Sequence, residues 1–547
     1  MSVDLLDVSL HSSAGRVEST DVDVVVVGAG FAGMYMLHRL REMGYSVQVF
    51  EAGTDVGGTW YWNRYPGARC DVESLEYSYS FDEKLQQDWE WTERYSSQPE
   101  ILSYANHVAD RFDLRRDIRF ETRVESAAFD EDHNAWFVRT SDEALTVGRF
   151  FVMATGCLSS ATTPDIEGKD EFSGTMAHTG RWPKEGLDLK GKRVGVIGTG
   201  SSGVQAIPVI AAQCDELIVF QRTPQYTVPA RNAGLDDDRQ NEIKSRYADF
   251  REANFAMPQA LGSEVSKYND SIHDVSDEER RERLQEAWDL GGTLFLASFT
   301  DVLLDESANV HAQDFVREKI SEIVSDPETA SKLTPEHIIG CKRLVIDTDY
   351  FETFNRPNVR LVDVGSEPIQ RITESGLSTK SEDFEFDVLV FATGFDAMTG
   401  SILRVDITGR EGTTIQEKWS AGPRTYLGLT VPGFPNMFTV SGPGSPSVLT
   451  NMIISIEQHV EWISDCISWL DEHQYSTIEA KTEAERAWVD HVNAKADRTL
   501  FPSCNSWYLG ANVPGKTRVF MPLLGFPGYV RRCDQVAENN YEGFVLQ

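Results

Sequence analysis

Two glycine fingerprints, each placed between a strand-like and a helix-like stretch, constrain the fold of this chain most strongly. The pattern G-x-G-x-x-G follows the apolar run at 23–27 and recurs after the run at 192–197. Each copy opens a helical stretch, and a second strand, at 46–51 or 216–220, completes a βαβ unit. The glycines are Gly28, Gly30 and Gly33 in the first copy and Gly198, Gly200 and Gly203 in the second. Two such units predict an α/β chain with two Rossmann-like dinucleotide-binding domains.

The end of the second strand predicts a different nucleotide for each unit. The glycines allow a tight turn and a close approach of the pyrophosphate, which then lies at the helix N-terminus. Glu51 stands 18 positions after Gly33, where an acid binds a free ribose. The second unit has Arg222 and Thr223 there, which suit the 2′-phosphate of NADP, although Arg222 could also be a surface arginine. The presence of both sites in one chain is explained if the first site binds FAD and the second binds NADPH, which reduces the flavin.

The length of 547 residues exceeds what one hydrophobic core supports, and the motifs divide the chain into discontinuous domains. Strands that end in Ala-Thr-Gly, at 150–156 and 386–394, indicate where the chain crosses between them. The expected FAD-binding domain comprises 21–158 and 384–547, and the NADP-binding domain comprises 159–229 and 336–383. Residues 230–335 are highly charged, place Val316, Ile320 and Val324 at helical spacing, and are expected to form a helical insertion. Residues 1–20 are expected to be a loose N-terminal segment.

The charge balance and the cysteines exclude several classes of partner. A net charge of −35 argues against nucleic acid and against an anionic membrane surface, because both require a basic patch. No signal peptide is visible, and no stretch reaches the roughly 18 apolar residues of a spanning helix, so a cytoplasmic protein is expected. The seven scattered cysteines lack metal-ligand spacing and indicate reduced thiols without a metal site. We expect a monomer or weak oligomer that acts on small molecules.

A flavin reduced by NADPH can pass its electrons to a disulfide, to another carrier or to O2. A disulfide reductase needs a redox-active cysteine pair at short spacing, and the sequence has none. The sequence also lacks a cysteine cluster for an iron–sulfur centre and an H-E-x-x-H motif. Reaction with O2 therefore remains as the expected route.

Two longer motifs resemble the signatures of a known family. Residues 172–183 match F-x-G-x-x-x-H-x-x-x-W-P, and residues 57–71 match G-G-x-W-x-x-x-x-Y-P-G-x-x-x-D, both typical of Baeyer–Villiger monooxygenases. The resemblance extends over about 20 to 545 and is strongest to the phenylacetone, steroid and cyclohexanone group of these class B flavoprotein monooxygenases. It implies that NADPH and O2 convert a ketone to an ester or lactone through a C4a-peroxyflavin and a Criegee intermediate. The alternatives are oxygenation of a sulfide or amine by the same peroxyflavin, and a non-oxygenating NADPH oxidase or redox sensor.

The resemblance also implies roles for single residues. Arg343 matches the catalytic arginine, which would stabilise the deprotonated flavin hydroperoxide and the developing alkoxide, and Asp71 matches the acid that orients it. Lys342 matches a second contact to the 2′-phosphate. Trp507 matches a tryptophan on a mobile loop that closes over the nicotinamide. His178, in the first motif, is interpreted as a residue of the linker between domains.

The expected contacts form three sets. Those to FAD are Gly28, Gly30, Gly33, Glu51, Gly58, Thr59, Trp60, Asp71, Tyr77 and Met452. Those to NADP are Gly198, Gly200, Ser201, Ser202, Gly203, Arg222, Thr223, Lys342, Arg343 and Trp507. Val448, Leu449 and Met452 are expected to border the substrate pocket. Trp60 could instead be a core aromatic, and Asp71 and Arg343 could form a structural salt bridge.

Overall fold

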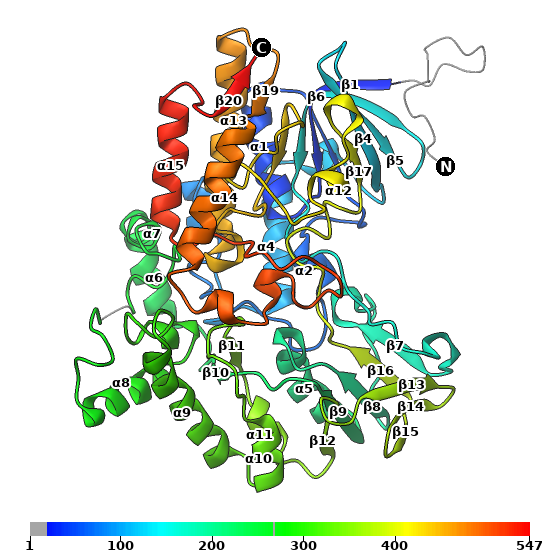
Figure 1. Cartoon of the computed structure of the whole chain (residues 1–547), viewed down its shortest axis with the longest axis vertical. Helices are drawn as coiled ribbons and strands as arrows, with labels where there is room; N and C mark the ends of the chain where they lie inside the picture. Colours follow the sequence, from blue (N-terminus) through cyan, green and yellow to red (C-terminus); the bar gives the residue numbers. More distant parts are fainter. Residues whose placement is uncertain (1–18, 266–267) are drawn as a thin grey trace.

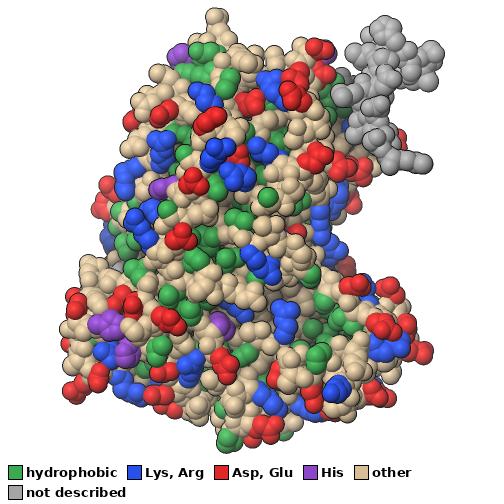
Figure 2. All heavy atoms as spheres, viewed as in Figure 1, with side chains coloured by type: hydrophobic (Ala, Val, Ile, Leu, Met, Phe, Trp, Pro, Cys, Tyr) green, Lys and Arg blue, Asp and Glu red, His purple; other side chains and the backbone are tan. Residues whose placement is uncertain are grey.

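The computed structural model describes residues 19–265 and 268–547, and it builds the chain around two sheets (Figure 1). In Figure 1 the first sheet and the C-terminal helices form the upper body, and the second sheet lies in the lower body. Acidic and basic side chains are intermixed over the face shown in Figure 2, without a continuous basic area. No helix within the described residues is long and apolar enough to cross a membrane.

The first sheet has the order β17-β4-β5-β6-β1-β2-β3, with β18 paired to β6. Strand β1 is parallel to β2 and β6, and its residues Val24, Val25 and Val26 are fully buried because both faces of this region are covered. Helix α1 packs against the long C-terminal helix α13. The strands are β1 Ser19–Val27, β2 Val47–Phe50, β3 Ile118–Arg119, β4 Val124–Asp130, β5 Ala135–Thr140, β6 Leu145–Met153, β17 Asp406–Thr408 and β18 Met437–Thr439. The helices are α1 Phe31–Glu42, α2 Thr59–Trp62, α3 Glu83–Asp88, α4 Gln98–Arg111, α12 Ile415–Lys418, α13 Met452–Glu472, α14 Thr482–Ala496 and α15 Phe526–Glu538, with a ribbon of β19 Ile478–Ala480 and β20 Phe544–Leu546.

The second sheet is entirely parallel and has the order β12-β9-β8-β16-β7. A three-stranded antiparallel ribbon contributes Ile372, Leu377 and Phe384 to a core shared with this sheet. The sheet strands are β7 Thr175–His178, β8 Arg193–Ile197, β9 Glu216–Gln221, β12 Val359–Asp363 and β16 Val388–Phe391. The ribbon strands are β13 Ile369–Thr373, β14 Gly376–Thr379 and β15 Asp383–Glu385, and the helices of this body are α5 Ser201–Gln213 and α11 Tyr350–Thr353. The predicted α/β class with two Rossmann-like units is confirmed.

Two expected boundaries need correction. The division at 384 placed residues 388–391 with the first sheet, but β16 lies between β8 and β7 in the second sheet. The reason is that the chain crosses after the Ala-Thr-Gly that ends β16, so the buried strand itself belongs to the second body. At the N-terminus, residues 1–18 of the expected loose segment lie outside the described residues, whereas residues 19 and 20 already belong to β1.

The chain between β10 (Thr227–Pro229) and β11 (Val345–Asp347) is largely helical. Its helices are α6 Asp237–Ser245, α7 Tyr247–Phe255, α8 Asp277–Leu290, α9 Glu306–Ile323 and α10 Pro327–Leu333. Helix α9 buries Val316 and Ile320, while Val324 is its C-terminal cap. Helices α8 and α9 pack into the core of the second body, but α6 and α7 place Ile243, Tyr247 and Phe250 in the core of the first. This region therefore joins the two bodies.

The two crossing segments lie side by side. The Thr162 amide donates to the Gly394 carbonyl at 2.9 Å, and the Asp396 amide donates to the Ser160 carbonyl at 2.8 Å. His178 is buried at this linker, where its Nε2 lies 3.2 Å from the Thr162 carbonyl and its Nδ1 accepts from the Gly180 amide at 2.9 Å. This position agrees with its interpretation as a linker residue.

The expectation that all seven cysteines are reduced thiols is wrong for two of them. Cys341 and Cys504 form a disulfide across a sequence separation of 163 residues. Cys70, Cys157, Cys214, Cys466 and Cys533 are free and buried. A pairing between positions so far apart depends on tertiary structure, which no spacing rule reports.

Candidate active site

The first glycine fingerprint forms a cradle closed by Glu51. A side chain at Gly33 would place its Cβ 1.8 Å from the Gly28 carbonyl oxygen, so only glycine lets the helix approach the strand here. Glu51 is buried at the end of β2; its Oε2 accepts from the Ala29 amide at 2.8 Å and its Oε1 accepts from the Gly53 amide at 2.7 Å. Each carboxylate oxygen has a second lone pair, which is free to accept from a ribose hydroxyl. The residues present fit a dinucleotide with an unphosphorylated ribose.

The second fingerprint has the same close packing, because a Cβ on Gly203 would lie 2.3 Å from the Gly198 carbonyl oxygen. Among the described residues, and apart from the neighbours of Gly200 in the chain, no heavy atom lies within 4 Å of the position that a Cβ on Gly200 would occupy, so the turn is open where a pyrophosphate would approach. Helix α5 starts there with Ser201 exposed and Ser202 half-buried. The amide groups of this helix end provide positive partial charge for phosphate.

Arg222 and Lys342 form a cationic pair beside this turn. Arg222 and Thr223 follow β9 and are exposed, whereas Lys342 is half-buried just before β11. Burial, and then the charge of Arg222, lower the pKa of Lys342. Within the described residues neither cation has a carboxylate partner. Two adjacent cations without a counter-charge form an anion site, and the 2′-phosphate of NADP fits the residues present.

Arg343 and Asp71 meet across 272 positions of sequence as a bidentate pair. The Arg343 Nε donates to Asp71 Oδ2 at 2.5 Å, and Nη2 donates to Oδ1 at 2.8 Å. The side chains are only 28% and 23% exposed. Burial alone would lower the pKa of Arg343, but the charge of Asp71 and these hydrogen bonds outweigh it and raise the pKa. The guanidinium is therefore permanently charged and held in one orientation.

The remaining nitrogen of Arg343 connects it to the expected substrate loop. Nη1 donates to the Val448 carbonyl at 2.7 Å, and the Arg343 carbonyl accepts from Gln225 Nε2 at 2.8 Å. Val448 is buried, while Leu449 and Met452 are half-buried. The structure thus brings the expected catalytic pair and the start of the expected substrate loop together.

Tyr508 is a site residue that the sequence reasoning missed. It is buried and lies close enough to the Arg343 guanidinium to interact with it electrostatically. Burial raises the pKa of Tyr508, while the charge of Arg343 acts in the opposite direction. Its neighbour Trp507 is half-buried, with its ring centroid 4.3 Å from that of Tyr508. The position next to Trp507, in the same N-S-W-Y-L-G-A-N block, was the available signal.

The expected flavin contacts divide into an open and a packed group. Thr59 is exposed at the start of α2 and Gly58, beside Gly30, is half-buried. Trp60 and Tyr77 are buried, and Trp60 Nε1 donates to the Tyr77 hydroxyl at 3.1 Å. Trp60 is therefore packed in the core and held against the Tyr77 ring, a position compatible with a flavin contact and with a core aromatic alike.

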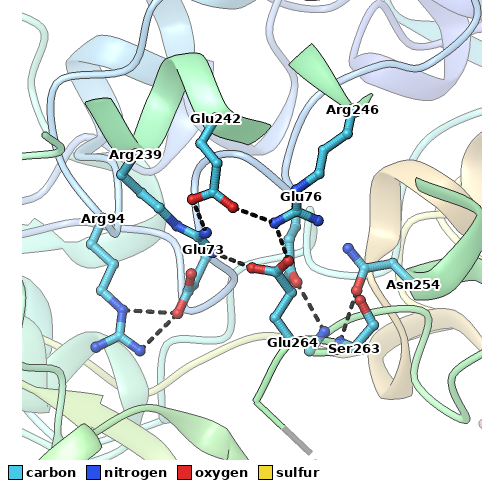
Figure 3. A network of polar contacts seen from close by, with 10 residues as sticks. Glu73, Glu76, Arg94, Arg239, Glu242, Arg246, Asn254, Ser263 and Glu264 are labelled. Carbon is cyan, nitrogen blue, oxygen red and sulfur yellow. Dashed lines mark hydrogen bonds and ion pairs between the residues drawn. The ribbon is translucent and has the colours of Figure 1, made fainter. Parts of the chain in front are cut away.

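The segment that carries Asp71 and Tyr77 is fixed by a contact of Glu76 to the helical insertion and by an ion pair of Glu73 with Arg94 (Figure 3). The Glu76 carboxylate accepts from the Gly262 amide at 2.9 Å, and Glu73 pairs with Arg94 at 2.7 Å. Burial, followed by the charge of Glu73, raises the pKa of Glu76 to about 7. Glu264, two residues after Gly262, is itself held between two arginines of the insertion, Arg239 and Arg246.

No group of three or more potential metal ligands occurs among the described residues. Residues 22–248 match the model of the pyridine nucleotide-disulphide oxidoreductase family. Full-length relatives include a phenazine N-monooxygenase from Lysobacter antibioticus, 44% identical over 97% of this chain and 98% of the relative. They also include an acetone monooxygenase (methyl acetate-forming) from Gordonia sp. strain TY-5, 43% identical over 96% and 99%. A Baeyer–Villiger monooxygenase from Pseudooceanicola batsensis is 41% identical over 98% of both chains.

Solved structures agree with these relatives. A steroid monooxygenase bound to NADP is 51% identical, with a TM-score of 0.91 over 96% of this chain and 99% of the other. The OTEMO complex with FAD and NADP is 41% identical, with a TM-score of 0.93 over 97% and 100%. Identity and coverage at this level, together with an arginine–aspartate pair between two nucleotide folds, show that the chain belongs to the Baeyer–Villiger monooxygenase family.

Proposed function

We propose that this protein is an FAD-containing, NADPH-dependent monooxygenase that uses O2 to convert a ketone into an ester or lactone. The observation that carries the proposal is the Arg343 guanidinium, which is charged, oriented by Asp71 and placed against the Val448 carbonyl and Tyr508. When bound, FAD would supply the hydride-acceptor and oxygen-transfer chemistry.

We propose that each of the two glycine fingerprints binds a different nucleotide. We assign FAD to the first fingerprint, where Glu51 would accept a hydrogen bond from a ribose hydroxyl and the Trp60–Tyr77 pair would support the flavin side. NADPH binds the second, where Ser201 and Ser202 open the helix. Arg222, Thr223 and Lys342 then hold its 2′-phosphate, because a charge-assisted hydrogen bond to each cation offsets their mutual repulsion.

Arg343 acts on the negative charge that develops during oxygen transfer. A fixed guanidinium stabilises an oxyanion on the former carbonyl oxygen of the substrate, and it needs no reorganisation because Asp71 holds it in place. A guanidinium also remains protonated, so it does not act as a proton source that would divert oxygen to hydrogen peroxide. Asp71 is a positioning residue in this scheme.

Trp507 and Tyr508 cover the site and exclude water. Their loop is tied to the linker, where Asn512 Nδ2 donates to the Phe395 carbonyl at 2.5 Å and Lys516 pairs with Asp396. The ketone lies between this cover and the loop formed by Val448, Leu449 and Met452. Movement of the cover would admit and release the nucleotide.

We propose an FAD-binding body formed by the first sheet and the C-terminal helices, and an NADP-binding body that extends to β16. The protein acts in the cytoplasm as a monomer or weak oligomer. Five free, buried cysteines support a reducing compartment. Among the described residues, the large exposed hydrophobic side chains are spread over elements of both bodies, among them Met43 at the end of α1, Met176 in β7 and Val545 in β20, which supports weak self-association.

The test is product analysis by mass spectrometry after incubation of the holoenzyme with NADPH, isotopically labelled O2 and linear, cyclic and aryl ketones. One labelled oxygen in an ester or lactone supports the proposal. NADPH consumption with hydrogen peroxide as the only product, across the ketone panel, contradicts it.

A second candidate, oxygenation at nitrogen or sulfur, is favoured by the 44% identity to a phenazine N-monooxygenase. Phenazines and alkyl aryl sulfides in the same assay would then give labelled N-oxides or sulfoxides. Arg343→Ala separates the two activities, because ester formation requires stabilisation of an alkoxide and heteroatom oxygenation does not.

A further inference from the structure

The disulfide joins the two segments that carry the cover and the cations of the site. Cys341 directly precedes Lys342 and Arg343, and Cys504 lies three positions before Trp507. The Cα atoms are 5.8 Å apart, within the range that a disulfide requires. The bond therefore connects the backbone that carries Arg343 to the loop whose Tyr508 contacts the same arginine.

We propose that Cys341 and Cys504 form a reversible redox switch, which in its oxidised state locks the Trp507 loop over the nucleotide site. The inference rests on the proposed monooxygenase function, because it concerns entry and release of NADPH at that site. In the oxidised state the cover is held by a covalent bond. In the reduced state it is held by polar contacts, among them the Lys516–Asp396 pair and the hydrogen bond from the Leu500 amide to the Leu303 carbonyl.

The remaining cysteines favour a reversible switch over a permanent structural disulfide. Five of the seven stay free and buried, as in proteins of reducing compartments. Disulfides that form in such compartments are usually transient and redox-sensing. Cys504 is only partly buried, and its neighbours Ser503 and Asn505 are exposed, so small oxidants and reductants reach this end of the bond.

Oxidation of the dithiol by hydrogen peroxide balances without other reactants. The Cys504 thiolate attacks one peroxide oxygen, the O–O bond breaks, and the oxygen that leaves takes a proton to form water. The Cys341 thiol then attacks the sulfenic acid of Cys504, the S–S bond forms, and a second water leaves with the remaining proton. Two thiols are oxidised and one peroxide is reduced. A small dithiol reverses the reaction by thiol–disulfide exchange and becomes a disulfide itself.

Locking the loop slows exchange of the nucleotide but does not change the rate of hydride transfer from bound NADPH. Neither cysteine belongs to the guanidinium contacts of Arg343, so hydride transfer from NADPH that is already bound keeps its rate. Entry of NADPH and release of NADP+ require the loop to move, and such steps limit turnover in many enzymes. We expect oxidation to slow both by about tenfold or more.

The experiment uses the full-length holoenzyme, reduced with dithiothreitol and then treated with hydrogen peroxide. Peptide mapping without reduction measures the Cys341–Cys504 link, and stopped-flow spectroscopy measures NADPH entry, flavin reduction and NADP+ release. The expected result is a linked peptide, slower nucleotide exchange, an unchanged reduction rate with nucleotide already bound, and full recovery after dithiothreitol.

Cys341→Ser and Cys504→Ser should each exchange nucleotide at the rate of the reduced wild type, before and after peroxide. Cys214→Ser, which alters a free buried cysteine on the second body, should keep the full response. Circular dichroism checks the fold of each variant, and the reduced wild type tests the switch without any mutation. Equal exchange rates in the oxidised and reduced wild type, or a peroxide response that survives in Cys504→Ser, would overturn the proposal.

These readouts follow the nucleotide and the flavin rather than the ester. If no ketone is oxygenated but exchange still depends on the redox state, the proposed reaction fails and the switch stands. If esters form at the same rate in both redox states and exchange is also unchanged, the switch fails and the reaction stands.

Discussion

The cationic pair of Arg222 and Lys342 beside the second fingerprint predicts a sharp change in coenzyme preference when Arg222 is replaced by alanine. Arg222 is exposed and shares its anion with the half-buried Lys342. A hydrogen bond to a charged group contributes about 1.5–3 kcal/mol, and exposure places Arg222 at the lower end. A loss of about 1.5 kcal/mol corresponds to roughly a tenfold fall in kcat/KM for NADPH. NADH lacks the phosphate, so its value should stay constant.

The assay is steady-state oxidation of both coenzymes by the FAD-loaded enzyme, with the ratio of the two kcat/KM values as the readout. Lys342→Ala should lower the same ratio by a similar factor. Arg531→Ala, at an exposed arginine of α15, is the matched control and should leave the ratio unchanged. A ratio in Arg222→Ala equal to that of the wild type would refute the assignment of this anion site, whereas an equal loss with NADPH and NADH would indicate damage to the fold.

Three further predictions concern the catalytic pair, the cover and the insertion. Asp71→Asn should lower kcat for ester formation and destabilise the protein by about 1–2 kcal/mol. This cost is below the roughly 3–5 kcal/mol of breaking a fully buried pair, because both side chains are about a quarter exposed. Unchanged kcat and melting temperature would contradict the positioning role. Tyr508→Phe should keep hydride transfer but raise the share of NADPH oxidised without product, measured as hydrogen peroxide per NADPH, and an unaltered share would remove Tyr508 from the site. The pKa of Glu76 is about 7 in the folded protein, against an ordinary value of 4.5. As the pH rises between these two values, the unfolded chain loses this proton before the folded protein does. The free energy of unfolding therefore falls over this range, by on the order of 3 kcal/mol in total. Urea titrations at pH 5 and pH 8 should show that Glu76→Gln loses less stability over this range than the wild type does, and equal losses would contradict the buried, protonated state.

Local spacing was sufficient for much of the fold and for both nucleotide cradles. The glycine fingerprints, the strands around them and the residues Glu51 and Arg222 lie within about 30 residues of one another in each unit, so backbone geometry alone relates them. The family motifs added Asp71 and Arg343, and the structure places these two in contact.

Contacts between distant segments were decided only by the tertiary structure. The Cys341–Cys504 bond, the Tyr508–Arg343 contact and the hydrogen bond from Arg343 to the Val448 carbonyl each join parts of the chain more than 100 residues apart. The same holds for β16, whose apolar sequence suits either sheet and whose place is set by pairing with β8 and β7. The physical reason is the range over which each signal acts. Hydrophobic periodicity and turn residues report on one or two neighbouring elements. These contacts depend instead on how separately packed parts of the chain meet, and no local sequence pattern encodes that.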